Sequence, residues 1–394
     1  MFARLAWLAL GTFAIGTETW VIAALLPPIA ADLSIQVATA GALVTVFALA
    51  YAFGSPVLAV VAGSVDRKWL LISCLGVFTL ANIGAANAQG FKQLLIARVL
   101  MALVSGLYVP TASAVATVLV KPEQRGRAIS VVIGGMAVAV ALGAPIGALI
   151  GAMSNWRMTF ALVAVLGAIA IVGLLIGLPR DLPRPVTTIG QRLAAARRPE
   201  ILHGLSVTLL FATGVFTVFT YLALLLGQAA GLDPRGISAT LFLFGVAAAL
   251  GNALGGTSSD RFGPLRTARI GLSLLVAVFV VIALAANALP TPQAAPVIVA
   301  SIGAWGLVAW CVYAAMMANL VRIAPELAMV TLSLNASTFY FGVALGSFVG
   351  SLVLRFGTGK LAWVAAALEL AALTVLLFER RTERMPRVAR EDAA

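Results

Sequence analysis

Long apolar stretches, separated by short polar turns, run through the whole chain. Each stretch approaches the roughly 20 residues that an α-helix needs to cross a bilayer. The stretches are too long for barrel strands and lack the alternation of polar and apolar residues that such strands show, which favours helices. We therefore predict an all-α membrane protein with transmembrane helices over residues 5–27, 38–62, 69–88, 93–119, 128–152, 158–178, 202–227, 237–257, 268–288, 294–320, 328–353 and 360–379.

Composition and charge support this class and set the topology. Hydrophobic residues make up 62% of the 394 and charged residues only 10%, which excludes an ordinary soluble domain. With twelve spans, all but six of the 26 Lys and Arg fall on the side of the two termini. Positive charge concentrates in cytoplasmic loops, so both termini are expected in the cytoplasm. The net charge of +12 is then a topology signal, and no nucleic-acid partner is expected.

The two halves of the chain repeat. The longest loop, 179–200, separates six spans from six and could form a short amphipathic helix over 189–198. The loop after the second span contains Asp66 and Arg67, and the loop after the eighth contains Asp260 and Arg261, about one half-chain later. Such recurrence indicates internal duplication. We expect an N-terminal six-helix domain over 1–178, a cytoplasmic linker over 179–200, a second six-helix domain over 201–379 and a basic cytoplasmic tail over 380–394.

These motifs resemble those of the major facilitator superfamily, in particular its twelve-helix drug–proton antiporter branch, near the arabinose and sugar efflux permeases. The loop Gly256 to Arg266 is similar to the family's cytoplasmic motif, and its first-half copy around Asp66 is shortened. Further similarity lies in Leu95–Gly106, in the glycines and Pro145 of the fifth span, and in Asn335 with Tyr340. The resemblance implies two pseudo-symmetric domains that alternate access to a central cavity lined by the first, fourth, seventh and tenth helices.

Glu18 is the most informative single residue. It lies in the middle of the first span, and no other charged residue occurs between Arg4 and Asp32. An ionisable group at that depth is costly, which favours a functional role. Arg98 in the fourth span lies at a similar depth, since a helix rises roughly 1.5 Å per residue, so a salt bridge between the two is expected. We interpret Glu18 and Arg98 as the proton-coupling pair; the alternative is a permanently ionised structural pair.

Two further groups of residues receive expected roles. The polar and aromatic stripes of the cavity-lining helices, with Asn335, predict a substrate cavity formed by Thr19, Met101, Ser105, Tyr108, Thr213, Thr217, Thr220, Tyr221, Trp310, Tyr313, Met317 and Asn335. Single hydroxyls among them could instead bond only to their own helix. Conformational gating is assigned to the loop charges and the fifth-span glycine run, in which Pro145 would bend the helix: Asp66, Arg67, Asp260, Arg261, Arg266, Gly143, Pro145 and Gly147.

The predicted function is export of a small organic solute, sugar-like or a drug, by proton antiport through alternating access. A proton-coupled importer or a facilitative uniporter would share the fold and remains the alternative. No enzyme is expected, because the chain has one histidine and only two buried acids, Glu18 and Glu369, far apart in sequence. Glu369 is expected to serve packing rather than coupling.

The expected partners follow from the same assignment. We expect no cofactor or metal, with the proton gradient as the energy source. The partners would be a small-molecule substrate, protons and the lipid bilayer, with the protein a monomer in a bacterial inner membrane. The sequence leaves the substrate open among sugars, nucleosides, amino-acid derivatives and lipophilic drugs.

Overall fold

The computed structural model describes residues 2–179 and 198–378, and in this part of the chain it has twelve helical spans long and apolar enough to cross a membrane. The predicted spans and the all-α fold are confirmed; the expected amphipathic helix over 189–198 and the tail lie outside the described residues, apart from residue 198. Nine spans are uninterrupted helices: α1 (Phe2–Asp32), α5 (Arg67–Ala86), α6 (Phe91–Val118), α9 (Trp156–Gly177), α13 (Pro234–Phe262), α14 (Pro264–Ala288), α15 (Thr291–Ile323), α16 (Ala328–Val353) and α17 (Lys360–Leu377).

The other three spans are interrupted. The second consists of α2 (Val37–Ala40), α3 (Ala42–Leu49), the π-helical turn η1 (Ala50–Gly54), α4 (Ser55–Val61) and the 3₁₀ turn η2 (Ala62–Ser64). The fifth follows the turn η3 (Pro122–Gln124) and consists of α7 (Arg125–Val138), the π turn η4 (Ala139–Gly143) and α8 (Ala144–Met153). The seventh breaks between α11 (Pro199–Phe219) and α12 (Leu222–Ala229), and the short turns η5 (Pro325–Leu327) and η6 (Leu354–Phe356) flank α16.

Each π turn ends two residues before a proline. Pro56 follows η1 and Pro145 follows η4, each at the start of the next α-helical piece. Proline lacks an N–H and its ring collides with the carbonyl four residues earlier, so a wider turn accommodates it without ending the helix. The sequence analysis predicts that Pro145 bends the fifth span, and the structure changes there from the π turn η4 to the α-helix α8.

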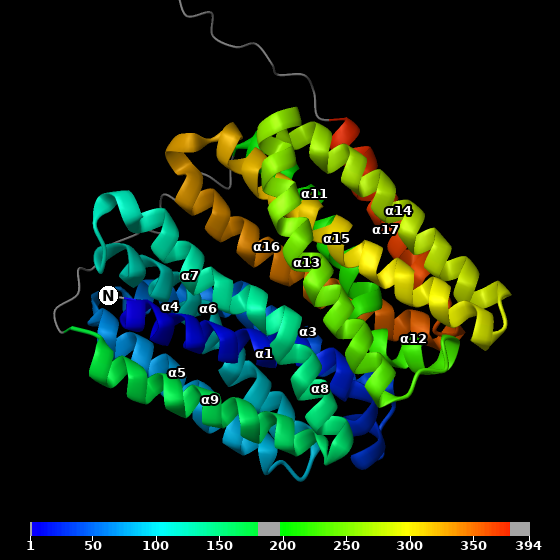
Figure 1. The fold of residues 1–394 in the computed structure, drawn as a ribbon, viewed down its shortest axis with the longest axis horizontal. Coiled ribbons are helices and arrows are strands. Elements are labelled where there is room, and N and C mark those ends of the chain that lie inside the picture. Colours follow the sequence, from blue (N-terminus) through cyan, green and yellow to red (C-terminus); the bar gives the residue numbers. More distant parts are fainter. Residues whose placement is uncertain (1, 180–197, 379–394) are drawn as a thin grey trace, which may run out of the picture.

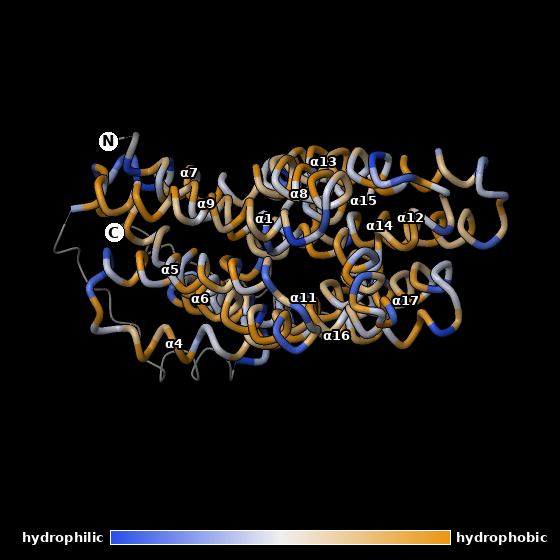
Figure 2. Tube along the Cα trace, turned by 90° about the horizontal axis from the view of Figure 1, so that it is seen from below, coloured by the Kyte–Doolittle hydropathy of each residue, from blue (hydrophilic) through white to orange (hydrophobic). Residues whose placement is uncertain are grey.

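The outward faces of the helices are apolar. Large hydrophobic side chains are exposed on many spans, for example Leu80 on α5, Ile176 on α9 and Leu250 on α13. Figure 2 shows hydrophobic residues along most of the helical length and hydrophilic residues mainly near helix ends. An exposed apolar belt of this kind suits contact with lipid tails, because the backbone polar groups are satisfied within the helices.

The two halves of the chain lie side by side as two helix groups, α1–α9 at the lower left of Figure 1 and α11–α17 at the upper right. Contacts between them join α3 and η1 to α16, η4 and α8 to α13, and α1 to α12. These elements belong to the part of the bundle between its middle and the end where α1 finishes at Asp32. We refer to that end as the Asp32 end.

Specific contacts hold the halves together there. The Ser238 hydroxyl on α13 donates to the Pro145 carbonyl at 2.7 Å, and the Ser347 hydroxyl on α16 donates to the Gly41 carbonyl at 2.9 Å. Near the middle of the bundle the rings of Tyr51 and Tyr340 stack with centroids 3.6 Å apart. The halves are therefore packed against one another from mid-bundle to the Asp32 end.

The repeated glycine runs pack helices within each half. Gly147 and Gly151 on α8 lie against Val21 and Leu25 of α1. On α16, Gly346 and Gly350 lie in the same way against the α11 backbone. The absence of side chains at these positions allows close helix approach. The predicted gating residues Gly143 and Gly147 thus face α1 in their own half, and the fifth span meets the other half through η4 and the Pro145 carbonyl.

Candidate functional site

Glu18 and Arg98 form a salt bridge in the interior of the first half. The Arg98 Nη1 group donates to Glu18 Oε1, and the two side chains are 1% and 0% exposed for Arg98 and Glu18. The guanidinium has two further partners on α3: its Nε donates to the Leu43 carbonyl at 3.1 Å, and its carbon lies 4.1 Å from the centre of the Phe47 ring. The contact predicted from sequence is confirmed, and α3 completes it.

The two charged groups of this pair have different surroundings. Arg98 has a carbonyl and an aromatic face besides Glu18, so α3 holds the guanidinium even when the carboxylate is removed. Glu18 Oε2, in contrast, is buried without a hydrogen-bond partner among the described residues. Leaving one charge of a buried pair without its partner costs about 3–5 kcal/mol. Of the two side chains only Glu18 can be neutralised by taking up a proton, and the contacts of Arg98 with α3 reduce the cost of then leaving the guanidinium without its partner.

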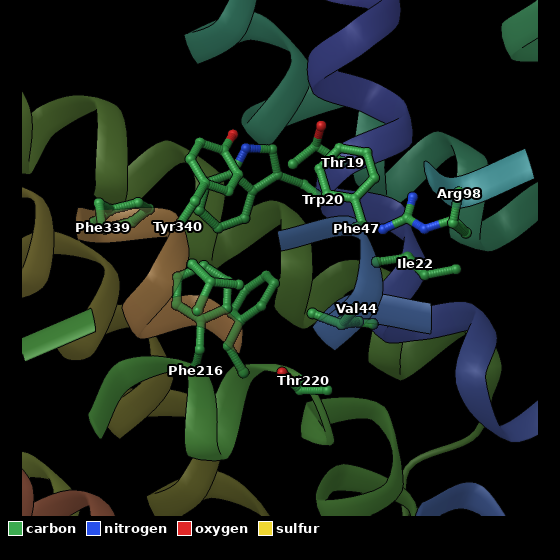
Figure 3. A pocket seen from close by; sticks show the side chains of 13 residues that line it. Thr19, Trp20, Ile22, Val44, Phe47, Arg98, Phe216, Thr220, Phe339 and Tyr340 are labelled. Atoms are coloured by element: carbon green, nitrogen blue, oxygen red, sulfur yellow. The ribbon is translucent and has the colours of Figure 1, made fainter. Parts of the chain in front are cut away.

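A cavity lies beside this pair, between the two halves, and its free space, including the part open to solvent, is about 410 Å³. Both halves contribute side chains, as Figure 3 shows for the labelled residues. The lining consists of Thr19, Trp20, Ile22, Ala23, Val44, Phe47, Arg98, Phe216, Phe219, Thr220, Phe339, Tyr340 and Val343.

Aromatic rings form most of the contacts across this cavity. Trp20 of the first half meets Phe216 and Phe219 of α11, with ring centroids 5.8 and 5.2 Å apart. Phe47 and Tyr340 approach to 6.5 Å from opposite halves. Aromatic pairs at such separations are attractive beyond their burial. The site is therefore an apolar, ring-lined chamber whose walls belong to two helix groups.

The lining includes Arg98 but not Glu18. Thr19 and Trp20, the next two residues of α1, face the cavity, whereas the carboxylate lies behind the wall against the guanidinium. Figure 3 shows the Arg98 side chain beside Phe47 at the edge of the chamber. A solute in the cavity would meet the positive member of the pair first.

Only part of the cavity predicted from sequence lies at this chamber. Thr19 and Thr220 line it, while Trp310 and Tyr313 stand one ring behind, Trp310 at 5.8 Å from Trp20 and Tyr313 at 5.0 Å from Phe339. The remaining predicted residues lie outside its lining: Met101, Ser105, Tyr108, Thr213, Thr217, Tyr221, Met317 and Asn335.

Most of those outlying residues have partners that explain their position. The hydroxyls of Thr213 and Thr217 each donate to the carbonyl one turn earlier at 2.7 Å, as expected for hydroxyls that serve their own helix. The Tyr221 hydroxyl donates to the Ser347 carbonyl at 2.9 Å. Asn335 is fully buried, donating to Met317 Sδ at 3.0 Å and accepting from Thr208 at 2.7 Å, so it joins α11, α15 and α16.

Many of the lining residues missed from sequence are aromatic, and several of these come from helices that the resemblance did not place at the cavity. Phe47 lies on the second span, and Phe339 and Tyr340 lie on the eleventh. Phe216 and Phe219 lie on the expected seventh span, where the sequence analysis predicts contacts through hydroxyl groups only. The sequence offers a signal for these rings, because an aromatic residue stands close to several of the predicted polar residues, as Trp20 does to Glu18.

The predicted gating charges differ between the two copies of the loop. Asp66 Oδ1 accepts the N–H groups of Lys68 and Trp69 at 3.0 and 3.2 Å and so caps α5. The Lys68 ammonium in turn donates to the carbonyls of Leu175 and Leu178, at the end of α9. The first copy therefore ties two helix ends of one half together.

The second copy is built differently. Asp260 and Arg261 still belong to α13, and the Arg261 guanidinium lies 5.2 Å from the Phe262 ring. Gly263, at φ 86°, then makes the turn into α14, where Arg266 is exposed. A latch between the halves by these charges remains a prediction for a conformation other than this one.

Glu369, the second buried acid, lies away from the chamber. It is fully buried on α17, and its carboxyl group faces the α11 backbone at Gly214. Neither oxygen has a hydrogen-bond partner among the described residues. Its position between two helices of one half is consistent with the expected packing role.

Comparison with known proteins gives a consistent picture over nearly the whole chain. A sequence model described as the Major Facilitator Superfamily matches residues 8–331 and 204–393. The inner membrane transport protein YdhP of Escherichia coli (strain K12) is 30% identical over 381 residues, which cover 96% of each chain. A chloramphenicol resistance protein of Streptomyces lividans is 31% identical over 258 residues, covering 64% of this chain and 66% of that one.

Two further comparisons, one with a sequence relative and one with a solved structure, cover nearly the whole chain. A probable sugar efflux transporter of Helicobacter pylori (strain G27) is 26% identical over 371 residues, covering 94% of this chain and 93% of that one. The crystal structure of a mutant of the nucleoside transporter NupG superposes with a TM-score of 0.77, covering 95% of this chain and 98% of that one. At 14% identity this last likeness concerns the fold alone.

Proposed function

The chain belongs to the major facilitator superfamily and is a multi-pass inner-membrane transporter of small solutes, not an enzyme; we propose that it exports its solute in exchange for protons. The observation that carries the proposal is the Glu18–Arg98 pair, buried directly behind the wall of a cavity that both halves line. Export is further supported by the names of two relatives, which refer to chloramphenicol resistance and to sugar efflux.

Coupling follows from what a proton does to the pair. Protonation of Glu18 removes its charge, and the attraction to Arg98 falls to that of a neutral hydrogen bond. Arg98 keeps its Leu43 carbonyl and Phe47 ring, so its position changes little while its charge is no longer balanced. The cavity then carries a net positive charge, which alters its affinity for a solute and for the opposite half. In this way a proton and a solute can occupy the carrier alternately.

The halves supply the conformational part of the cycle. We assign the Asp32 end to the periplasm because the basic residues gather at the opposite end. Since the halves are packed together from mid-bundle to the Asp32 end, the side that we assign to the periplasm is closed in this structure. Rocking about the central cavity would break these contacts and bring the loops at Asp66 and Asp260 toward the facing half, as expected for alternating access.

The proposal is tested by transport in proteoliposomes with an imposed proton gradient. Wild type should move solute against its gradient when protons flow the opposite way, and Glu18→Gln, which mimics protonated Glu18, should abolish this coupling and bind solute more weakly. Glu369→Gln is the matched control, since it alters the other fully buried acid, outside the cavity lining; it should keep coupled transport. If protons and solute instead moved in the same direction, the protein would be an importer. Full pH-dependent transport by Glu18→Gln would remove that residue from the mechanism.

A further inference from the structure

The chamber beside Glu18 and Arg98 has few polar groups free to bind a solute. The Thr19 hydroxyl donates to the Ile15 carbonyl at 2.8 Å, and the Arg98 guanidinium is held by Glu18, Leu43 and Phe47. The Thr220 hydroxyl, in contrast, is buried at the break between α11 and α12 and has no hydrogen-bond partner in the part of the chain that the structure describes. This hydroxyl stands among six aromatic rings of the lining, two of which, Trp20 and Tyr340, carry an N–H and a hydroxyl at the ring edge.

This inventory suits an aromatic solute better than a polyhydroxylated one. Each hydroxyl group of a sugar loses its water on entering an apolar chamber and must find a protein partner there, or binding is penalised. Ring faces at Trp20, Phe216, Phe219 and Phe339 instead offer stacking and edge contacts to a planar ring. The chamber offers the Thr220 hydroxyl, the polar edge groups of Trp20 and Tyr340, and several aromatic contacts.

The charges around the chamber argue for an uncharged solute. A cation would meet the Arg98 guanidinium, because Glu18 lies behind the wall and not in the lining. An anion would compete with the Glu18 carboxylate for Arg98, and its binding would favour protonation of Glu18. Solute and proton would then be taken up together, which is the opposite of exchange. A neutral solute leaves the ionised pair intact and is compatible with release of the proton.

We infer that the transported solute is an uncharged, planar aromatic compound with few hydrogen-bonding groups, and that Thr220 is a specificity-determining contact for one of them. This inference rests on the proposed function for the direction of proton movement, but the choice of solute class rests on the cavity. Among the sugars, nucleosides, amino-acid derivatives and lipophilic drugs that the sequence leaves open, it excludes sugars and charged compounds, cationic drugs included.

The test is binding of matched probes to the purified full chain, followed by calorimetry. Biphenylmethanol, biphenylmethylammonium and biphenylcarboxylate share a ring system and differ in charge, and glucose serves as the polyhydroxylated probe. The neutral alcohol should bind about tenfold more tightly than either ion, and glucose should not bind measurably. Equal or tighter binding of the cation or of glucose, or failure of the alcohol to bind up to its solubility limit, would overturn the inference.

Two matched substitutions locate the contacts. Thr220→Val should weaken the alcohol about fivefold and leave methylbiphenyl, which lacks the hydroxyl, unaffected. Thr217→Val, one turn earlier and outside the lining, should change neither. Phe216→Leu should weaken both ring compounds, whereas Phe211→Leu, buried on the same helix outside the lining, should not. A Thr220→Val effect that is the same with and without the ligand hydroxyl would contradict the assigned contact.

Proton measurements made in the same titrations separate this inference from the proposed function. Tight binding of the neutral alcohol without proton release would defeat the antiport mechanism and leave the solute class standing. Binding of glucose with proton release would defeat the solute class and leave antiport standing.

Discussion

Gly245→Ala should shift the balance between the conformations of this transporter. Gly245 lies on α13 against the π turn η4 of the other half, and an added Cβ would lie 2.5 Å from both Ala141 Cα and the Val140 carbonyl oxygen. These are backbone atoms of a packed helix, which cannot move aside as a flexible side chain can. Overpacking of this kind costs about 1–3 kcal/mol. Because the clash exists only while the halves are closed at the Asp32 end, the equilibrium should move about 5- to 150-fold toward the open arrangement.

The shift can be measured as a distance distribution between spin labels. Met153, at the end of α8, and Arg235, in the first turn of α13, are exposed at the Asp32 end on opposite halves. They would be labelled as cysteines after Cys74 and Cys311 are replaced by alanine. Gly245→Ala should enlarge the population at long distance.

Two other glycines of α13 serve as controls for this experiment. Gly255→Ala introduces a clash at 2.6 Å with the Cys311 carbonyl oxygen, but within one half, so it should lower stability without changing the distance distribution. Gly256→Ala meets nothing within 4 Å and should change neither. An unchanged distribution in Gly245→Ala, or the same change in Gly255→Ala, would refute the assignment of this contact as part of the closed gate.

Three further predictions follow from contacts of single side chains. Asp66→Ala removes the cap of α5 and should lower the free energy of unfolding by about 0.5–2 kcal/mol, whereas the exposed Asp260→Ala should change it little; thermal unfolding in detergent distinguishes them. Ser347→Ala deletes a hydrogen bond between the halves worth about 0.5–1.5 kcal/mol, and should favour the open arrangement in the same label experiment, unlike Ser351→Ala, whose hydroxyl bonds within α16. Asn335→Leu removes the side-chain partner of the Thr208 hydroxyl, which keeps the Gly204 carbonyl, and should cost about 0.5–1.5 kcal/mol in thermal unfolding.

The sequence predicts the spans and the buried pair well because strong, local physics governs both. Each span is a long apolar segment, and a bilayer admits only helices or closed barrels, whose strands are shorter and alternate, so composition and length suffice. Glu18 and Arg98 are single charges at matching depth, where an unpaired charge is too costly to persist. Few alternative partners exist, and the structure brings the two together.

The cavity is predicted less well because its wall depends on how the helices rotate and how the halves pack. A hydroxyl on a lining helix can satisfy itself on its own backbone, as Thr213 and Thr217 do, and then need not face a solute. Aromatic residues such as Phe47 and Tyr340 look like ordinary apolar positions in a membrane span. Only the contact between α3 and α16 reveals that they meet at the cavity.

The repeated loop shows a similar limit. Both copies contain an acid followed by an arginine, but Asp66 caps α5 whereas Asp260 remains within the last turns of α13. The difference depends on where each helix ends, and one glycine at positive φ, Gly263, moves that end in the second copy. Sequence similarity of the two loops therefore does not give them the same contacts.

Proton release from the purified protein on solute binding tests the central claim most directly. Weakly buffered wild type would be mixed with a panel containing biphenylmethanol, chloramphenicol, a nucleoside and glucose while a pH indicator is followed. We predict that the solute that binds releases protons from wild type and from Glu369→Gln, and that its weaker binding to Glu18→Gln releases none. Proton release that persists in Glu18→Gln, or solute binding to wild type with no release, would contradict the assignment of Glu18 as the site where proton and solute are exchanged.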